Sequence, residues 1–213
     1  MDNNVASINP SRDLADFFDF MYGNQDGYVY LPTKDPASNA LKQDFCQWPA
    51  QRDDMIAPVL TASPKREVYF VPALYTQPAS RKDFIKGTYV LWAEFDGKVP
   101  ESWGDIPLPT LRVRSSEPGH EHVYWKLDYF EVDVDTIERA NRGLTYSLGA
   151  DTSGWDANQI LRPVASFNHK RNKPVHMVSK NSNLLSVEFF AGIPEPQQAV
   201  RENISLEEIP DTL

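Results

Sequence analysis

Two carboxylates inside one strand-like run constrain this chain more than any other feature. The run is "VLWAEFDG" (residues 90–97), whose apolar and aromatic residues indicate a β-strand. Because side chains alternate along a strand, Glu94 and Asp96 project from the same face. Like charges repel, and burying either acid is unfavourable, so removing one should stabilise a metal-free protein. The pattern predicts either an exposed strand face or a divalent-cation site.

The surrounding pattern predicts an α+β fold with a largely antiparallel central sheet flanked by helices. Apolar residues recur at helical spacing in two segments, with Ser11 and Asp135 as expected N-caps. The predicted helices are residues 11–23 and 133–149. Alternating apolar runs bounded by turn residues predict the strands. These are residues 27–33, 66–75, 89–97, 110–116, 122–130, 174–180 and 184–190.

A histidine-bearing strand follows the acid pair. In "SSEPGHEHVYW" (residues 115–125), His120, His122 and Tyr124 alternate with other residues and share one face. A histidine at this place can contact a phosphate or transfer a proton. It can equally be a surface residue of a hairpin.

A third acid leaves the second predicted helix. Asp151 comes directly after Gly149 and Ala150, and Asp156 follows about one turn later. Asp151 is a candidate third metal ligand, with a capping or turn role as the alternative. No acid occurs between residues 157 and 187, a stretch in which Arg162 and Lys170 are candidates for phosphate contacts.

Composition limits the possible functions. The net charge of −9 argues against non-specific nucleic-acid binding, but the basic residues are unevenly distributed. The single cysteine, Cys46, rules out an internal disulfide and a cysteine-rich zinc module. No run approaches the roughly 18 apolar residues of a membrane span, and the first residues lack a signal-peptide core. We therefore expect a cytoplasmic protein.

The order of these motifs resembles the catalytic domain of the archaeo-eukaryotic primase (AEP) superfamily, in particular its phage- and plasmid-type primase–polymerases. That family shows D-x-D or D-x-E, then S-x-H or S-P-G-x-x-H followed by Y-W, a third Asp, and a later R…N-x-K segment. The matching residues here are Glu94 and Asp96; Ser115, Ser116, Pro118 and Gly119; His122, Val123, Tyr124 and Trp125; Gly149, Ala150 and Asp151; and Arg162, Asn168 and Lys170.

This sequence departs from the family pattern at several positions. The first acid is Glu94 rather than Asp, and Glu117 interrupts the Ser-Pro-Gly turn. The insertion makes His120 a rival of His122, although the following "VYW" favours His122. Gln159 stands where an arginine is usual, and Ala165 stands where a glycine is usual.

The resemblance implies a DNA primase or polymerase: a two-metal nucleotidyl transferase with an RRM-like core that adds (d)NTPs in DNA replication or priming. It implies residues 1–193 as the catalytic domain and residues 194–213 as an acidic, proline-containing tail or linker. The implied partners are single-stranded template DNA, (d)NTPs and, beyond the tail, a helicase or other replication domain. The implied ligands of two Mg²⁺ or Mn²⁺ ions, which are also the catalytic residues, are Glu94, Asp96 and Asp151. The implied nucleotide-binding residues are Ser115, Ser116, His122, Arg162 and Lys170.

Two other functions stay open from the sequence. A rolling-circle replication initiator nuclease would use the "HEH" of residues 120–122 for a metal and Tyr146 as nucleophile, but it leaves Glu94 and Asp96 without a role. A catalytically degenerate primase fold that only binds DNA is the second. The sequence does not decide between RNA and DNA synthesis, or between de novo priming and extension.

Overall fold

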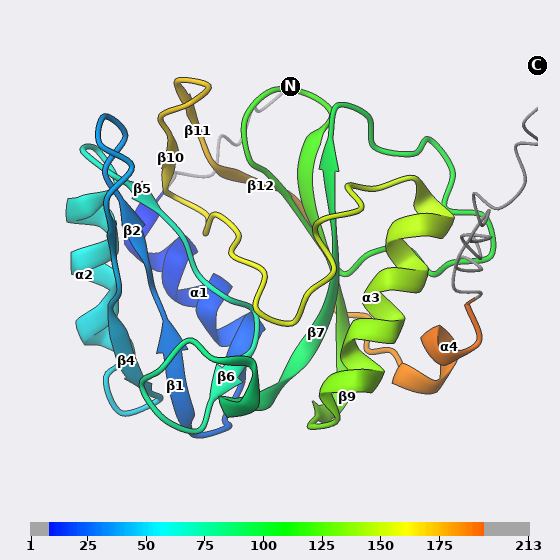
Figure 1. Cartoon of the computed structure of the whole chain (residues 1–213). Coiled ribbons are helices and arrows are strands. Elements are labelled where there is room, and N and C mark those ends of the chain that lie inside the picture. The colour runs from blue at the N-terminus through cyan, green and yellow to red at the C-terminus, as the bar shows by residue number, and fades with distance from the viewer. Residues whose placement is uncertain (1–8, 194–213) are drawn as a thin grey trace, which may run out of the picture.

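The structure is a computed structural model, and it describes residues 9–193 (Figure 1). Its helices are α1 (Pro10–Tyr22), α2 (Arg52–Ala62), α3 (Val134–Leu148), α4 (Val187–Ala191) and the 3₁₀ helix η1 (Lys82–Phe84). Its strands are β1 (Gly27–Tyr30), β2 (Thr33–Lys34), β3 (Leu41–Lys42), β4 (Phe45–Trp48), β5 (Glu67–Val68), β6 (Leu74–Tyr75), β7 (Ile85–Asp96), β8 (Leu111–Arg114), β9 (His120–Glu131), β10 (Phe167–Asn168), β11 (Lys173–Pro174) and β12 (His176–Lys180).

The expected fold class is confirmed. Seven strands form one sheet in the order β12-β8-β9-β7-β6-β1-β4, and every pairing between them is antiparallel. Strands β3-β2-β5 and β10-β11 form two smaller sheets. No helix within residues 9–193 is long and apolar enough to cross a membrane.

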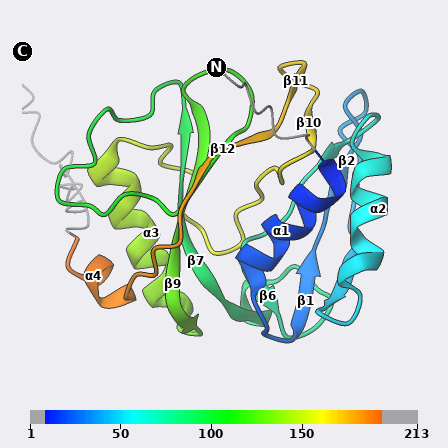
Figure 2. The same cartoon turned by 180° about the vertical axis from the view of Figure 1, so that it is seen from behind.

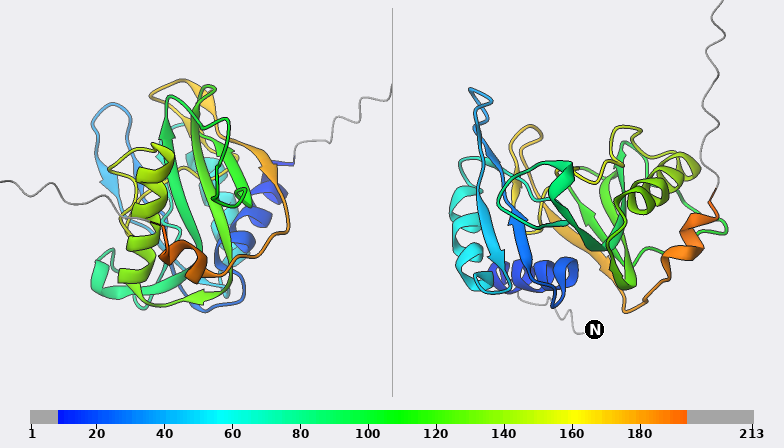
Figure 3. Two further views of the ribbon diagram at one scale, coloured as in Figure 1. Left: turned by 90° about the vertical axis from the view of Figure 1, so that its right-hand side faces the viewer. Right: turned by 60° about the horizontal axis from the view of Figure 1, so that its bottom comes forward.

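Helices cover the β7–β9 region on both sides. On one side lie α3 and α4, where Trp125 of β9 meets Phe190 of α4 with ring centroids 6.3 Å apart (Figure 3, left). On the other side lies α1, whose Phe17 meets Tyr124 at 6.3 Å; Figure 2 shows α1 from behind. Successive residues of β9 therefore face opposite layers. The even-numbered residues from His120 to Tyr124 face the half of the molecule that contains α1, α2 and β1.

The outer edge of β7 loses its strand partner after Gly87, near the start of the strand. Strand β6 pairs with β7 only at Ile85 and Gly87. Further along, the edge is satisfied by other groups: the Trp92 amide donates to Asn141 Oδ1 of α3 at 2.9 Å, and the Asp151 amide donates to the Glu94 carbonyl at 2.7 Å. The sheet thus divides beside the acid pair. The segment after α3 crosses β7 at this division (Figure 1).

Several local predictions were wrong. Asn9 and Asp133 are the N-caps of α1 and α3, because their side chains, and not those of Ser11 and Asp135, accept amide hydrogen bonds of the first turn. Residues 184–190 were expected to form a strand, but Ser186 caps the short helix α4.

Two further differences lie in the half of the molecule that contains α1. The expected strand at residues 66–75 is divided into β5 and β6 by a segment that includes Pro72. Helix α2 was not predicted, and Pro58 lies inside it.

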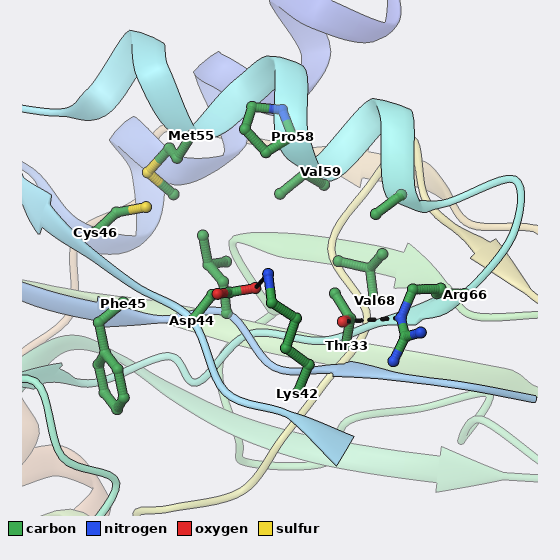
Figure 4. A pocket seen from close by; sticks show the side chains of 12 residues that line it. Thr33, Lys42, Asp44, Phe45, Cys46, Met55, Pro58, Val59, Arg66 and Val68 are labelled. Carbon is green, nitrogen blue, oxygen red and sulfur yellow. Dashed lines mark hydrogen bonds and ion pairs between the residues drawn. The ribbon is translucent and has the colours of Figure 1, made fainter. Parts of the chain in front are cut away.

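A small sheet in the same half has two different faces. In β5, Val68 points toward α2, whereas its neighbours Glu67 and Tyr69 point away from it. Between α2 and this sheet is a mainly apolar pocket of about 440 Å³, with Met55 and Val59 on the helix side (Figure 4). None of the predicted site residues lines this pocket. The other face of the small sheet is turned toward the division beside β7.

Candidate active site

Two acids of β7 stand directly opposite two histidines of β9. Glu94 pairs in register with His122, and Asp96 pairs with His120. The imidazole of His122 lies 3.6 Å from Glu94, measured from Nε2 to Oε1, and His120 Nδ1 contacts Asp96 Oδ1 more closely. Two predictions are confirmed: the two acids share one face of their strand, and the two histidines share one face of theirs. The two faces are the same face of the sheet, which the sequence alone did not show.

The expectation of a buried acid pair was wrong. The Asp96 side chain is 61% exposed, and that of Glu94 is 25% exposed. Asp96 is the last residue of β7, where the chain turns into Gly97 and leaves the sheet. Because each acid also has a histidine beside it, the repulsion between the acids is partly offset by groups of the protein itself.

Glu94 is held by one group from β9 and one from the segment after α3. Gln159 Nε2 donates to Glu94 Oε2 at 3.0 Å, while Oε1 faces His122. Burial on its own would raise the pKa of Glu94, but the His122 imidazole, the Gln159 amide and the charge of Arg162 outweigh burial and keep this pKa below its ordinary value. Glu94 is therefore ionised at neutral pH.

Asp151 lies with the acid pair, and Asp156 does not. The backbone of Asp151 is fixed to β7 through its hydrogen bond to the Glu94 carbonyl. Asp151 and Asp96 line one open pocket of about 550 Å³, together with Lys98. Asp151 Oδ1 also accepts bonds from the amide and hydroxyl of Ser153, so the alternative turn role is present too. Asp156 instead caps a turn through Asn158.

The predicted serines belong to the turn that joins β8 and β9. Ser115 and Ser116 are both buried. The Ser115 amide donates to the His120 carbonyl at 2.9 Å, and the Ser115 carbonyl accepts from Asn168 Nδ2 at 2.9 Å. Asn168 thereby attaches the β10–β11 hairpin to the histidine-bearing turn.

Two buried polar atoms lie behind the acids. His122 is 1% exposed, whereas His120 is 16% exposed. His122 Nδ1 and the Tyr124 hydroxyl are buried and have no hydrogen-bond partner within the described residues. Burial and the charge of Glu94 both raise the pKa of Tyr124, so its hydroxyl stays neutral. His122 therefore stands in the floor of the site, and His120 stands nearer its opening.

Arg162 already has an acidic partner. Its Nε lies 2.9 Å from Glu67 Oε2, and a second guanidinium nitrogen donates to the Tyr69 hydroxyl at 3.2 Å. Glu67 is buried and also accepts the Lys170 amide at 3.0 Å. The side chain of Lys170 is exposed. The two predicted cations thus reach one wall of the site, but Glu67 neutralises the first of them.

Sequence reasoning missed Gln159 and Glu67 as parts of this site. The sequence showed Gln159 only as a replacement for a usual arginine, and Glu67 lies outside every motif. Both contacts depend on the path of the chain between α3 and β10, which brings residues about 65 and 95 positions apart into contact. The local pattern contains no signal for such pairs.

Solved structures of primases share this fold. The AEP domain of the primase–polymerase (PrimPol) of cyanophage S-2L aligns with a TM-score of 0.67 at 15% identity, over 85% of this chain and 97% of that one. The catalytic domain of primase RepB′ in complex with initiator DNA aligns with a TM-score of 0.64 at 12% identity, over 85% of this chain and 94% of that one.

A second RepB′ structure aligns with a TM-score of 0.63 at 12% identity, over 85% of this chain and 62% of the longer RepB′ chain. No protein-family model matches the sequence, and no curated protein matches it at the sequence level. At these identities the likeness concerns the fold. The fold is that of AEP-type primase–polymerase catalytic domains, as the order of motifs had predicted.

Proposed function

We propose that this protein is a template-directed nucleotidyl transferase that adds (d)NTPs to a growing strand in DNA replication or priming. The observation that carries the proposal is the place of three acids in a primase-type fold. Glu94 and Asp96 project from one face of β7, and the backbone of Asp151 is fixed to the same strand. Such a set of carboxylates suits a pair of divalent cations.

The chemistry of the donors fits Mg²⁺ or Mn²⁺, because both cations prefer carboxylate oxygens. Asp96 and Asp151 line the same pocket. No three His, Cys, Asp or Glu side chains within residues 9–193 already stand in an arrangement that could hold a metal ion. We infer that cation binding turns Asp96 away from His120 and draws Glu94 from His122.

Bound cations would supply Lewis-acid activation of the attacking hydroxyl and offset the charge of the triphosphate. The protein's own residues fix the carboxylates and add donors. Gln159 and His122 hold Glu94 in place. Lys170 offers an exposed ammonium group at the wall of the site. The assignments of Ser115, Ser116, His122, Arg162 and Lys170 to the triphosphate remain predictions.

The arrangement of tyrosine and histidine does not favour the rolling-circle nuclease. His120 and His122 face the side of β9 toward α1. Tyr146 belongs to α3, which lies on the other side of β7 and β9 (Figures 1 and 3). A nucleophilic tyrosine must reach a phosphate held beside the histidines. A catalytically degenerate module that only binds DNA is distinguished from the enzyme by the synthesis experiment described next.

The test is synthesis from a labelled nucleotide on single-stranded DNA, with and without a primer, in Mg²⁺ and in Mn²⁺. We expect metal-dependent product from the wild-type protein and none from Asp96→Ala. Asp105→Ala, at an exposed loop position, is the matched control. Absence of product in either metal, with DNA binding intact, would favour the binding module. Full synthesis by a folded Asp96→Ala protein would refute the metal-site proposal.

A further inference from the structure

A second, cationic pocket lies beside the acids and shares no residue with the Asp96–Asp151 pocket. It encloses about 270 Å³ and is built from segments that lie far apart in the sequence. Strands β2 and β5 with the β2–β3 turn supply one wall, and the segment between α3 and β11 supplies the other. The lining residues are Lys34, Pro36, Asn39, Glu67, Tyr69, Arg162, His169 and Lys170.

The pleat of the small β3-β2-β5 sheet sets which side chains reach this pocket. Thr33 pairs with Val68, and the neighbouring pair is Lys34 with Glu67. Because successive residues face opposite ways, Thr33 and Val68 line the pocket under α2, and Lys34 and Glu67 line the cationic pocket. Figure 4 shows the α2 face of this sheet, with Thr33 and Val68 in the pocket under α2.

The charges of this pocket do not cancel. Three cations and one carboxylate line it, which leaves a net charge of +2 in a protein whose total is −9. Glu67 is taken by Arg162 at 2.9 Å. Within the described residues, no acid lies within ion-pair distance of Lys34 or Lys170. The excess positive charge therefore resides on these two flexible ammonium groups, one from each wall.

The cationic pocket is close enough to Glu94 for the charges of the two to affect each other. The charge of Arg162 lowers the pKa of Glu94. Burial raises the pKa of Tyr69, and the charge of Glu94 adds to that rise. Gln159, which holds Glu94, is only three residues before Arg162. A chain of phosphates that passes the acids would reach this pocket next.

We propose that this pocket binds the phosphodiester backbone of a single-stranded DNA segment whose reacting end lies at Glu94, Asp96 and Asp151. Lys34 and Lys170 bind its phosphate oxygens from opposite walls, and this assigns Lys170 to the strand in place of the triphosphate contact expected from the sequence. The inference rests on the proposed function for the direction of the strand, but not for the binding itself. Ammonium groups on long stems suit a backbone that is bound irrespective of base sequence.

A nucleotide triphosphate fits this pocket less well. It must contact cations held by Asp96 and Asp151, and those acids line the other pocket. Among the cations of this pocket, Arg162 is the one whose charge acts on Glu94, and Glu67 already neutralises it. The unneutralised ammonium of Lys34 lies on the opposite wall, on β2. Binding a strand uses both walls at once.

The experiment measures binding of a fluorescent oligothymidylate by anisotropy, across a series of salt concentrations and without metal or nucleotide. We expect Lys34→Ala to weaken binding roughly three- to tenfold. The slope of log K against log salt should become shallower by about 0.7, the value for one lost contact with a single strand. Combining Lys34→Ala with Lys170→Ala should lower the slope by about 1.4.

Lys42→Ala is the matched control, because Lys42 lies on the α2 face of the same small sheet and pairs with Asp44 at 2.9 Å. It should leave affinity and slope unchanged, and a thermal melt should show all three variants folded. An unchanged slope in Lys34→Ala, or a loss equal to that of Lys42→Ala, overturns the inference. So does a change confined to the KM for nucleotides, which would assign the pocket to the triphosphate.

The two proposals fail in different ways. If the wild-type protein makes no product but Lys34→Ala lowers DNA affinity, the pocket stands and the proposed enzyme does not. If product forms while Lys34→Ala binds DNA like the wild type, the enzyme stands and the pocket does not.

Discussion

His120 contacts Asp96 across the β7–β9 pair, and two residues further along the strands His122 faces Glu94 at 3.6 Å. Each of the two acids of β7 thus has its own imidazole. Without a cation, these histidines hold the two carboxylates apart and aligned. A cation therefore has to compete with His120 for Asp96 and with His122 for Glu94 before these acids can hold it.

Replacing Asp151, the third candidate ligand, should distinguish its role from that of Asp156. Asp151→Asn keeps the turn with Ser153 but removes a charge from the pocket shared with Asp96. We expect metal-dependent synthesis to fall by about 10²–10³-fold, the range for losing one group that stabilises charge in a transition state. Asp156→Asn, in the same segment, is the control and should retain activity. The reverse result would move the third acid to Asp156.

Gln159 should set the affinity of the site for metal. Gln159→Ala removes the donor on Glu94 Oε2 and leaves that carboxylate free to turn. Loss of a group that orients a metal ligand typically costs 10–100-fold in metal affinity. Titration with Mn²⁺, followed by electron paramagnetic resonance of the free ion, measures this without synthesis. Gln77→Ala, at an exposed position, is the control, and equal affinity in the two variants would contradict the prediction.

Removing Glu94 should destabilise the metal-free protein at neutral pH, contrary to the expectation of a buried repulsion. The pKa of Glu94 is lower in the folded state than its ordinary value of 4.5. Its ionised form therefore contributes stability above the unfolded-state pKa, and this contribution is lost as pH falls through the folded-state pKa. Urea unfolding should show Glu94→Gln less stable than the wild type at pH 7, with a smaller difference near about pH 3.5.

The exposed Glu101→Gln variant serves as the control for this comparison, because it removes one charge in a loop. It should follow the wild type across the same pH range. A gap between Glu94→Gln and the wild type that widens as pH falls would contradict the sign of the Glu94 effect.

Gly119 should tolerate no side chain. Its φ is +92°, and a Cβ would lie 2.1 Å from the Gly97 carbonyl oxygen, where β7 leaves the sheet. We expect Gly119→Ala to cost at least about 2 kcal/mol, because a left-handed conformation and a backbone clash add together. The melting temperature should fall by roughly 4–8 °C. Gly104 has φ +58°, and a Cβ there would have no atom within 4 Å. Gly104→Ala therefore measures the cost of the left-handed conformation without the cost of a clash.

Alternation along β7 and β9 could be read from the sequence, because a period of two depends only on neighbouring residues. It placed Glu94 with Asp96 and His120 with His122. The register between the two strands could not be read in the same way. It is fixed by the turn at residues 115–119, where Gly119 approaches Gly97.

Contacts made by isolated residues were beyond the sequence pattern. Glu67 accepts a hydrogen bond from Arg162, and Asn141 of α3 accepts one from the Trp92 amide. Neither Glu67 nor Asn141 belongs to a periodic pattern that indicates its partner. The short helix α4 was mistaken for a strand, because "LLSVEFF" is mostly apolar and only the cap at Ser186 distinguishes the two. Tertiary packing decided these cases.

The hydrogen bond from the Asp151 amide to the Glu94 carbonyl attaches Asp151 to β7. The candidate site therefore consists of two structural parts, one that carries the acids and one that carries Arg162. Glu94, Asp96 and Asp151 all travel with β7. Arg162 travels with the opposite half, through its pairing with Glu67 and the bridge between Phe70 and Leu161. Any change in the angle between the halves would alter the reach from the acids to Arg162 and would act on the Glu94 carboxylate through Gln159. The backbones that carry the three acids stay together, whereas the orientation of the Glu94 carboxylate depends on the placement of both halves.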